Sequence, residues 1–159
     1  MEKILGNTAY KEQVDRLGVI AFVPNGVSMW PHLKNHGQSV VVEKKKERLK
    51  KYDVGFYTRA NGACVLHRVL EVTDDGYVMC GDSQFVTEKV KEDSVFGVMI
   101  GFYVKDKYLS ANDSKYIKRV ERWYAHKTYR KFRVSIFMFS RRVINKIKRI
   151  FKLEKKQSV

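Results

Sequence analysis

Apolar residues follow two different periods along the chain, and the period changes near residue 114. Between residues 18 and 104, short apolar runs are separated by turn-forming Gly, Asn and Asp residues, as in antiparallel sheets. The runs predict strands at residues 18–23, 39–43, 54–58, 63–72, 77–80 and 95–104, the last either continuous or bent at a glycine. A helical spacing of apolar residues predicts a short helix over residues 7–17. These elements indicate a mostly β fold, a coiled antiparallel sheet or a small barrel.

After Ser114 the apolar residues recur every three to four positions, which is a helical period. One apolar series covers one side of a helical wheel and basic residues cover most of the other; it comprises Phe132, Ile136, Phe139, Val143, Ile147, Ile150 and Phe151. We expect two helices, or one long helix that bends near Thr128. The chain therefore divides into a domain over residues 1–113, with its core at about 18–104, and a helical basic appendage over residues 114–159.

The positive charge of the chain lies almost entirely in this appendage. Residues 1–113 hold 16 Lys and Arg against 15 Asp and Glu, whereas residues 114–159 hold 16 against 2. A basic helix with an apolar side can lie in a lipid headgroup layer, so residues 132–153 are expected to bind an anionic membrane surface. The alternatives are a helix packed on the domain or on a second copy, and a nucleic-acid tail. Aromatic residues interleaved with Arg at 122–133 permit nucleic-acid binding, but phosphate contacts do not need the apolar stripe.

Two features bear on the compartment. No stretch approaches the roughly 18 apolar residues of a spanning helix, and the first residues do not have the pattern of a secretion signal. We therefore expect a cytoplasmic protein, with the appendage available for peripheral attachment to the inner face of a membrane.

Cys64 and Cys80 both lie in apolar segments, so we expect buried reduced thiols, no disulfide, no metal site and no cofactor.

The candidate chemistry begins at Ser28, between an apolar strand and a turn fixed by Pro31. A serine hydroxyl needs a base to act as a nucleophile. His67 lies in an apolar strand that would orient it, whereas His32 and His36 share the loop of Ser28 and are expected to be solvent-exposed. Asp82 follows a glycine at a strand end. Each residue also has an ordinary structural interpretation: Ser28 as a cap or loop residue, His67 as a structural histidine and Asp82 as a turn residue. Together they are the three side-chain types of a hydrolytic triad.

Several segments together resemble the conserved boxes of the signal peptidase superfamily, which includes the self-cleaving repressors. Residues 26–33, followed by Gly37 and the run 40–42, are similar to its Ser-Met-x-Pro box. The later boxes are matched in order by residues 52–57, 65–70, 81–84 and 95–98. The resemblance covers about residues 18–104. His67 stands where the bacterial leader peptidases have lysine, so the likeness is to the Ser-His branch of archaeal and endoplasmic-reticulum signal peptidases.

This resemblance implies a serine endopeptidase that cleaves a leader peptide or precursor protein. Ser28 would be the nucleophile, His67 the general base and Asp82 the carboxylate that orients it. The substrate would pair as an added strand near Met29 and Val65, with small side chains before the scissile bond. The alternative is a non-enzymatic module: an inactive peptidase fold that binds peptides, or an adaptor at a membrane surface or on nucleic acid.

Overall fold

The structure is a computed structural model that describes residues 7–34 and 38–157. The helices are α1 (Asn7–Leu17), the 3₁₀ turn η1 (Glu92–Ser94), α2 (Ser114–Ala125) and α3 (Lys127–Gln157). The strands are β1 (Val19–Phe22), β2 (Val40–Lys44), β3 (Val54–Thr58), β4 (Cys64–Thr73), β5 (Gly76–Cys80), β6 (Glu88–Lys91), β7 (Val95–Val104) and β8 (Lys107–Ser110). The predicted helix over residues 7–17 and the six predicted strands are confirmed.

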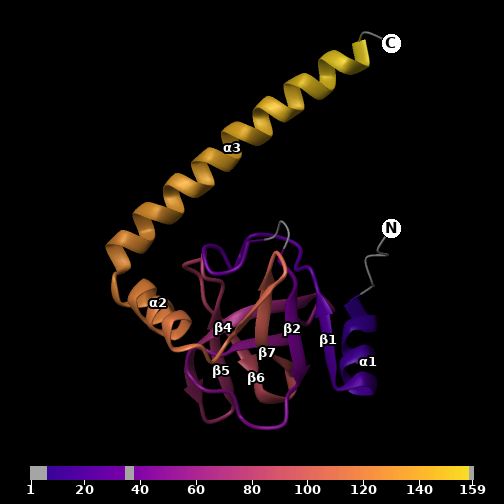
Figure 1. Ribbon diagram of the computed structural model, residues 1–159, viewed down its shortest axis with the longest axis vertical. Helices are drawn as coiled ribbons and strands as arrows, with labels where there is room; N and C mark the ends of the chain where they lie inside the picture. The colour runs from indigo at the N-terminus through magenta and orange to yellow at the C-terminus, as the bar shows by residue number, and fades with distance from the viewer. Residues whose placement is uncertain (1–6, 35–37, 158–159) are drawn as a thin grey trace. The chain divides into compact units, whose positions relative to one another are not determined.

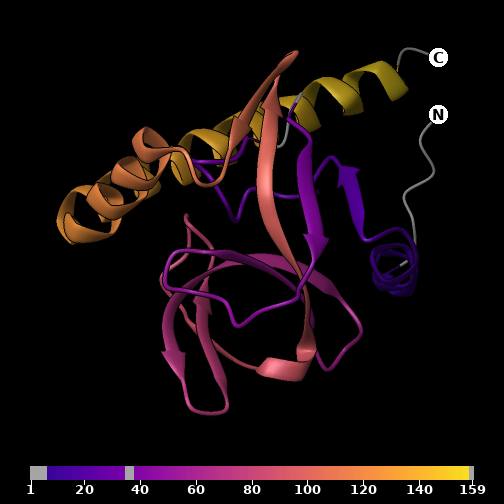
Figure 2. The same cartoon turned by 60° about the horizontal axis from the view of Figure 1, so that its bottom comes forward.

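The strands form one eight-stranded antiparallel sheet in the order β1-β2-β7-β3-β4-β5-β6, with β8 paired to β7. Figure 2 shows the long β7 strand rising from η1 through the middle of this sheet. Within the described residues the sheet is open, because β1 and β6 end the strand order without pairing with each other. The predicted antiparallel sheet is therefore confirmed, and the described strands do not close into the small barrel that was the other predicted form.

Strand β7 is continuous, and it joins the pair β1-β2 to the strands β3-β4-β5-β6. Along its length it pairs with β2, β3 and β8. A side chain at Gly97 would lie 2.6 Å from a methyl group of Val42, so the close approach of β2 requires glycine there. Gly97 is therefore a point of crowding between the paired strands β2 and β7, and β7 does not end there.

Two strands escaped the sequence analysis, β6 and β8. Both have four residues and lie at the rim of the sheet, and both begin with a charged residue. Short, charged strands are typical of sheet edges, where they oppose further pairing with another chain. Their apolar runs are too short to stand out from a loop.

Two groups of apolar side chains are prominent among the described residues of the sheet domain. One consists of buried side chains from β3 to β7 and the preceding loop: Leu49, Tyr57, Val69, Tyr77, Met79, Val90 and Val95. The other is aromatic and joins α1 to the sheet, since the ring of Tyr10 lies 4.9 Å from that of Phe22 and 5.7 Å from that of Phe56. Figure 1 shows α1 beside β1 at this end of the sheet.

The predicted helical appendage is confirmed as α2 and α3, with the break at His126. The chain divides into two compact units after Glu121, within α2, whereas the sequence analysis placed the boundary before residue 114. The first turns of α2 belong with the sheet because the ring of Tyr116 packs 5.4 Å from that of Phe102. None of the described helices is both long and apolar enough to cross a membrane.

Candidate active site

Ser28 lies in the loop between β1 and β2, in a tight series of turns. The Trp30 amide donates to the Val27 carbonyl at 3.0 Å, and the Leu33 amide donates to the Met29 carbonyl at 2.9 Å. The side chains of Met29 and Leu33 are buried, whereas Ser28 is half-buried. The apolar residues thus anchor the loop and leave the serine near the surface.

A second loop, Gly81–Ser83, is bonded directly to the Ser28 loop. The Ser83 amide donates to the Ser28 carbonyl at 2.8 Å, and the Ser83 hydroxyl lies 2.9 Å from the Val27 carbonyl oxygen. A side chain at Gly81 would approach the Ser28 carbonyl oxygen to 2.8 Å and the Ser28 Cβ to 3.0 Å. Glycine at this position therefore lets two segments far apart in the sequence touch.

Asp82, in that second loop, forms a buried ion pair with Arg68. The guanidinium donates from Nε to Oδ1 at 2.8 Å and from Nη2 to Oδ2 at 2.7 Å. Burial alone would raise the pKa of Asp82, but Arg68 and His32 more than offset it and hold this pKa well below its usual value. The charge is thus retained in the protein interior because it is fully paired.

His32 is the third member of this buried group. Its Nδ1 lies 3.0 Å from Oδ2 of Asp82. The expectation that His32 would be solvent-exposed is wrong: the side chain is buried. The sequence indicates only a loop at this position. In the structure the ion pair of Asp82 with Arg68 gives the buried His32 side chain a polar partner. His36, the other loop histidine, lies outside the described residues.

His67 is buried on the opposite face of β4 from Arg68, because successive side chains of a strand alternate. Its Nδ1 lies 3.2 Å from the Tyr57 hydroxyl and 3.3 Å from Oε1 of Glu88. Burial lowers the pKa of His67, and the neighbouring Glu88 carboxylate partly opposes that shift. His67 is therefore a neutral imidazole at neutral pH, the form that can accept a proton.

Glu88 is held in place by Arg59, whose Nε donates to Oε2 at 2.7 Å and whose Nη2 also contacts Oε1. The Arg59 hydrogen bond is the main reason that the pKa of Glu88 is lowered. The sequence analysis missed Glu88 because it predicted no strand between residues 80 and 95. The available signal was the alternation in Glu88-Lys89-Val90-Lys91, which puts Glu88 on the same side as the buried Val90.

The predicted triad is thus only partly assembled. The structure brings Ser28 next to the Asp82 loop, and Asp82 to Arg68, which adjoins His67 in sequence. It does not join Asp82 to His67 by a hydrogen bond; the carboxylate at His67 is that of Glu88. In the described residues, no hydrogen bond connects the Ser28 hydroxyl to His67.

Of the predicted substrate-binding residues, Met29 has a buried side chain and Val65 is half-buried. The β4–β5 ladder ends at the pair Arg68–Cys80. Among the described strands, Val65–His67 is consequently paired only on its β3 side. This stretch of β4 is an edge among the described strands, and the loop of Asp82 leaves β5 where the edge begins.

The two cysteines are not joined in a disulfide; Cys80 is buried, whereas Cys64 is only half-buried and burial raises the pKa of its thiol. Within residues 7–34 and 38–157 no group of three or more His, Cys, Asp and Glu side chains is placed to hold a metal ion.

Comparison of the chain with protein-family models, with curated proteins and with solved structures gave no match.

Proposed function

We propose that the sheet domain is a serine endopeptidase of the signal peptidase type, with Ser28 as nucleophile and His67 as general base. One observation carries the proposal. The β4–β5 register pairs Arg68 with Cys80, and its extension by one residue sets Gly81 opposite His67. The space that a Gly81 side chain would fill is taken by the Cβ of Ser28, 3.0 Å from that position.

Directly opposed residues of an antiparallel pair have Cβ atoms about 4.5–5.5 Å apart on the same face. The Cβ of Ser28 thus lies beside the position that a cross-strand neighbour of His67 would occupy. A hydroxyl and an imidazole at such positions are within reach through side-chain rotation. Catalytic hydrogen bonds are often long or absent without substrate and tighten when it binds.

The surroundings of His67 favour a general base. With Nδ1 facing the Tyr57 hydroxyl and Glu88, a proton on that nitrogen is satisfied, and Nε2 is left as the acceptor. Glu88 then performs the role expected of Asp82: it fixes the tautomer and stabilises the imidazolium. Asp82 acts as a positioning residue, because its contacts with Arg68 and His32 tie the loop that carries Ser28 to β4.

In the reaction, the Ser28 hydroxyl oxygen attacks the substrate carbonyl carbon while His67 takes the hydroxyl proton. We expect the backbone N–H of Ser28 to donate to the oxyanion; one such donor is typically worth about 10²–10³ in rate. His67 passes the proton to the departing amine as the peptide C–N bond breaks. A water molecule, deprotonated by His67, then attacks the acyl-serine ester; as the ester C–O bond breaks, His67 returns the proton to the Ser28 oxygen and the carboxyl product leaves.

The substrate class follows from the edge of β4. An extended peptide can pair with the side of Val65–Leu66 that has no strand beside it, which would bring its backbone toward His67 and the Ser28 loop. Backbone pairing selects extended, unfolded chain segments rather than folded proteins. A leader peptide or the flexible end of a precursor has this form, and the family resemblance adds a preference for small side chains before the cleaved bond.

The purified full chain should be incubated with a library of extended peptides and the new termini identified by mass spectrometry. We expect cleavage after small residues by the natural sequence and by Ser94→Ala, a control that removes a hydroxyl from η1. Ser28→Ala should give no cleavage. Equal cleavage by Ser28→Ala, or none by any form, would contradict the proposal; binding of the peptides without cleavage would then establish a peptide-binding module.

A further inference from the structure

Helix α3 carries a continuous apolar side that is exposed. Phe132 and Phe139 are 63% and 68% exposed. The other large apolar residues of this side are also exposed: Ile136, Val143, Ile147 and Ile150. Their separations of three, four and seven residues place them all on one side of the helix. Exposed apolar surface of this extent marks an interaction site.

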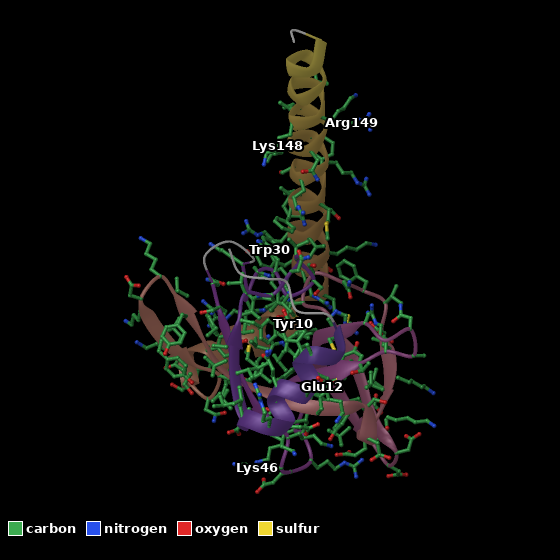
Figure 3. The ribbon with its side chains drawn as sticks, turned by 90° about the vertical axis from the view of Figure 1, so that its right-hand side faces the viewer. Tyr10, Glu12, Trp30, Lys46, Lys148 and Arg149 are labelled. Carbon is green, nitrogen blue, oxygen red and sulfur yellow. The ribbon has the colours of Figure 1, made fainter. Side chains whose placement is uncertain are left out.

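The same helix is strongly cationic. From Arg122 to Leu153 the chain contains no Asp or Glu, and the single acidic residue of α3 is Glu154. Basic residues cover the sides away from the apolar stripe, and Figure 3 shows Lys148 and Arg149 projecting from opposite sides of the helix. Lys146 lies at the border of the stripe, where a long stem can cover apolar surface while its ammonium remains in a polar layer.

The exposed apolar side and the positive charge of α3 together limit which kind of partner can cover the helix. Two copies of α3 packed through their apolar sides would bring cationic flanks together, because the helix offers no acidic residue before Glu154 to pair with them. A nucleic acid would match the charge but leave the phenylalanine and isoleucine side chains in water. An anionic lipid surface satisfies both, because its phosphates meet the cations and its acyl boundary takes up the apolar side.

We propose that α3 is a peripheral membrane anchor that lies parallel to a bilayer rich in anionic phospholipid. The apolar stripe enters the boundary between headgroups and acyl chains, and the flanking Lys and Arg residues contact lipid phosphates. The proposal is independent of catalysis: it concerns where the domain is held, whatever its activity.

The test is co-sedimentation of the full chain with phosphatidylcholine vesicles that contain or lack phosphatidylserine. Two variants separate the contributions. In the first, Phe132→Gln, Ile136→Gln and Phe139→Gln remove apolar surface and keep the charge. In the second, Arg141→Gln, Lys148→Gln and Arg149→Gln remove charge and keep the stripe. Glutamine is a good helix former, and circular dichroism of each variant checks that α3 persists.

We expect binding to the anionic vesicles that greatly exceeds binding to phosphatidylcholine alone. The charge variant should lose roughly fivefold in affinity for each cation removed. The apolar variant should lose at least tenfold, and its loss should persist at high salt.

The same proteins should be titrated with duplex DNA to measure DNA binding. In a separate experiment, light scattering should measure the molar mass of each protein and so its oligomeric state. Unchanged vesicle binding by the apolar variant would overturn the proposal, and so would binding to DNA but not to anionic vesicles. A dimer that dissociates in the apolar variant and does not bind vesicles would establish a second copy as the occupant instead.

Discussion

Two polar clusters lie on opposite faces of β4, at the adjacent residues His67 and Arg68, and each contains a histidine, a carboxylate and an arginine. In the first, Arg68, His32 and Asp82 are all buried, and both Asp82 oxygens accept hydrogen bonds from Arg68. Protonation of Asp82 would leave the buried Arg68 guanidinium without its counter-charge. This cluster is suited to holding two loops together and not to exchanging protons.

The second cluster has the same chemical types and a different exposure. His67 is buried, but the Glu88 and Arg59 side chains are 28% and 38% exposed. Its carboxylate is shared between Arg59 and the imidazole, so a proton on His67 can be stabilised while water remains close. In the proposed mechanism the two clusters therefore differ in role, and the difference comes from the extent of enclosure and pairing and not from residue identity.

Substitution of each histidine in turn gives the largest expected contrast between the clusters, in kcat. We expect His67→Ala to lower kcat by about 10⁶, the scale seen when the base of a serine hydrolase is removed. His32→Gln should change kcat of the folded protein less than tenfold, since this histidine contacts the structural carboxylate of Asp82 and takes no part in proton transfer in the proposed mechanism. Steady-state cleavage of the best library peptide measures both. A larger loss for His32→Gln than for His67→Ala would reverse the assignment of the two clusters.

Removal of the two arginines gives the next contrast, in stability. Arg68→Met leaves Asp82 charged and buried, and should lower the free energy of unfolding by about 3–5 kcal/mol. Arg59→Met breaks a partly exposed pair and should lower it by no more than about 1 kcal/mol. Urea denaturation followed by tryptophan fluorescence gives both values. The double variant Arg68→Met/Asp82→Asn should recover part of the loss; similar losses from both single variants would mean that the clusters do not differ in enclosure.

The pH dependence of catalysis tests whether Glu88 acts on the base. Activity requires neutral His67, whose pKa lies below the usual 6.5, mainly because of burial. The value of kcat/KM should therefore rise with pH through a midpoint below 6.5 and then remain level. Glu88→Gln removes a carboxylate that raises this pKa, so the midpoint should move to still lower pH, with a roughly ten- to hundredfold lower rate at neutral pH. A midpoint that stays in place or moves upward would contradict a role for Glu88.

Tyr57→Phe should have the smallest effect. It removes the hydroxyl 3.2 Å from Nδ1 of His67 and leaves the buried ring. Burial raises the pKa of Tyr57, so the hydroxyl stays protonated throughout the assay range and contributes one hydrogen bond. A loss of about 0.5–1.5 kcal/mol corresponds to a rate change of no more than about tenfold. A loss as large as that of Glu88→Gln would show that the hydroxyl, and not the carboxylate, orients the base.

Local pattern sufficed for most of the fold. The alternation and short spacing of the apolar runs determined α1 and six of the eight strands, and the change to a helical period determined α2, α3 and the break between them. These features depend on which side of each element meets the core, and that information repeats every two or every three to four residues. Strands β6 and β8 were missed because four residues with one or two apolar members carry too little of that repeat.

The sequence by itself determined the candidate residue types, the contrast between a nearly neutral domain and a cationic helix, and the presence of Ser28 in a turn. Only the tertiary structure decided which carboxylate meets which histidine. Asp82 and Glu88 are equally plausible partners in the linear chain, and Arg68 lies next to His67 in it. The strand register and the alternation of side chains along β4 send them to opposite faces. Pairing between ionisable groups far apart in sequence is set by that register, which no local pattern encodes.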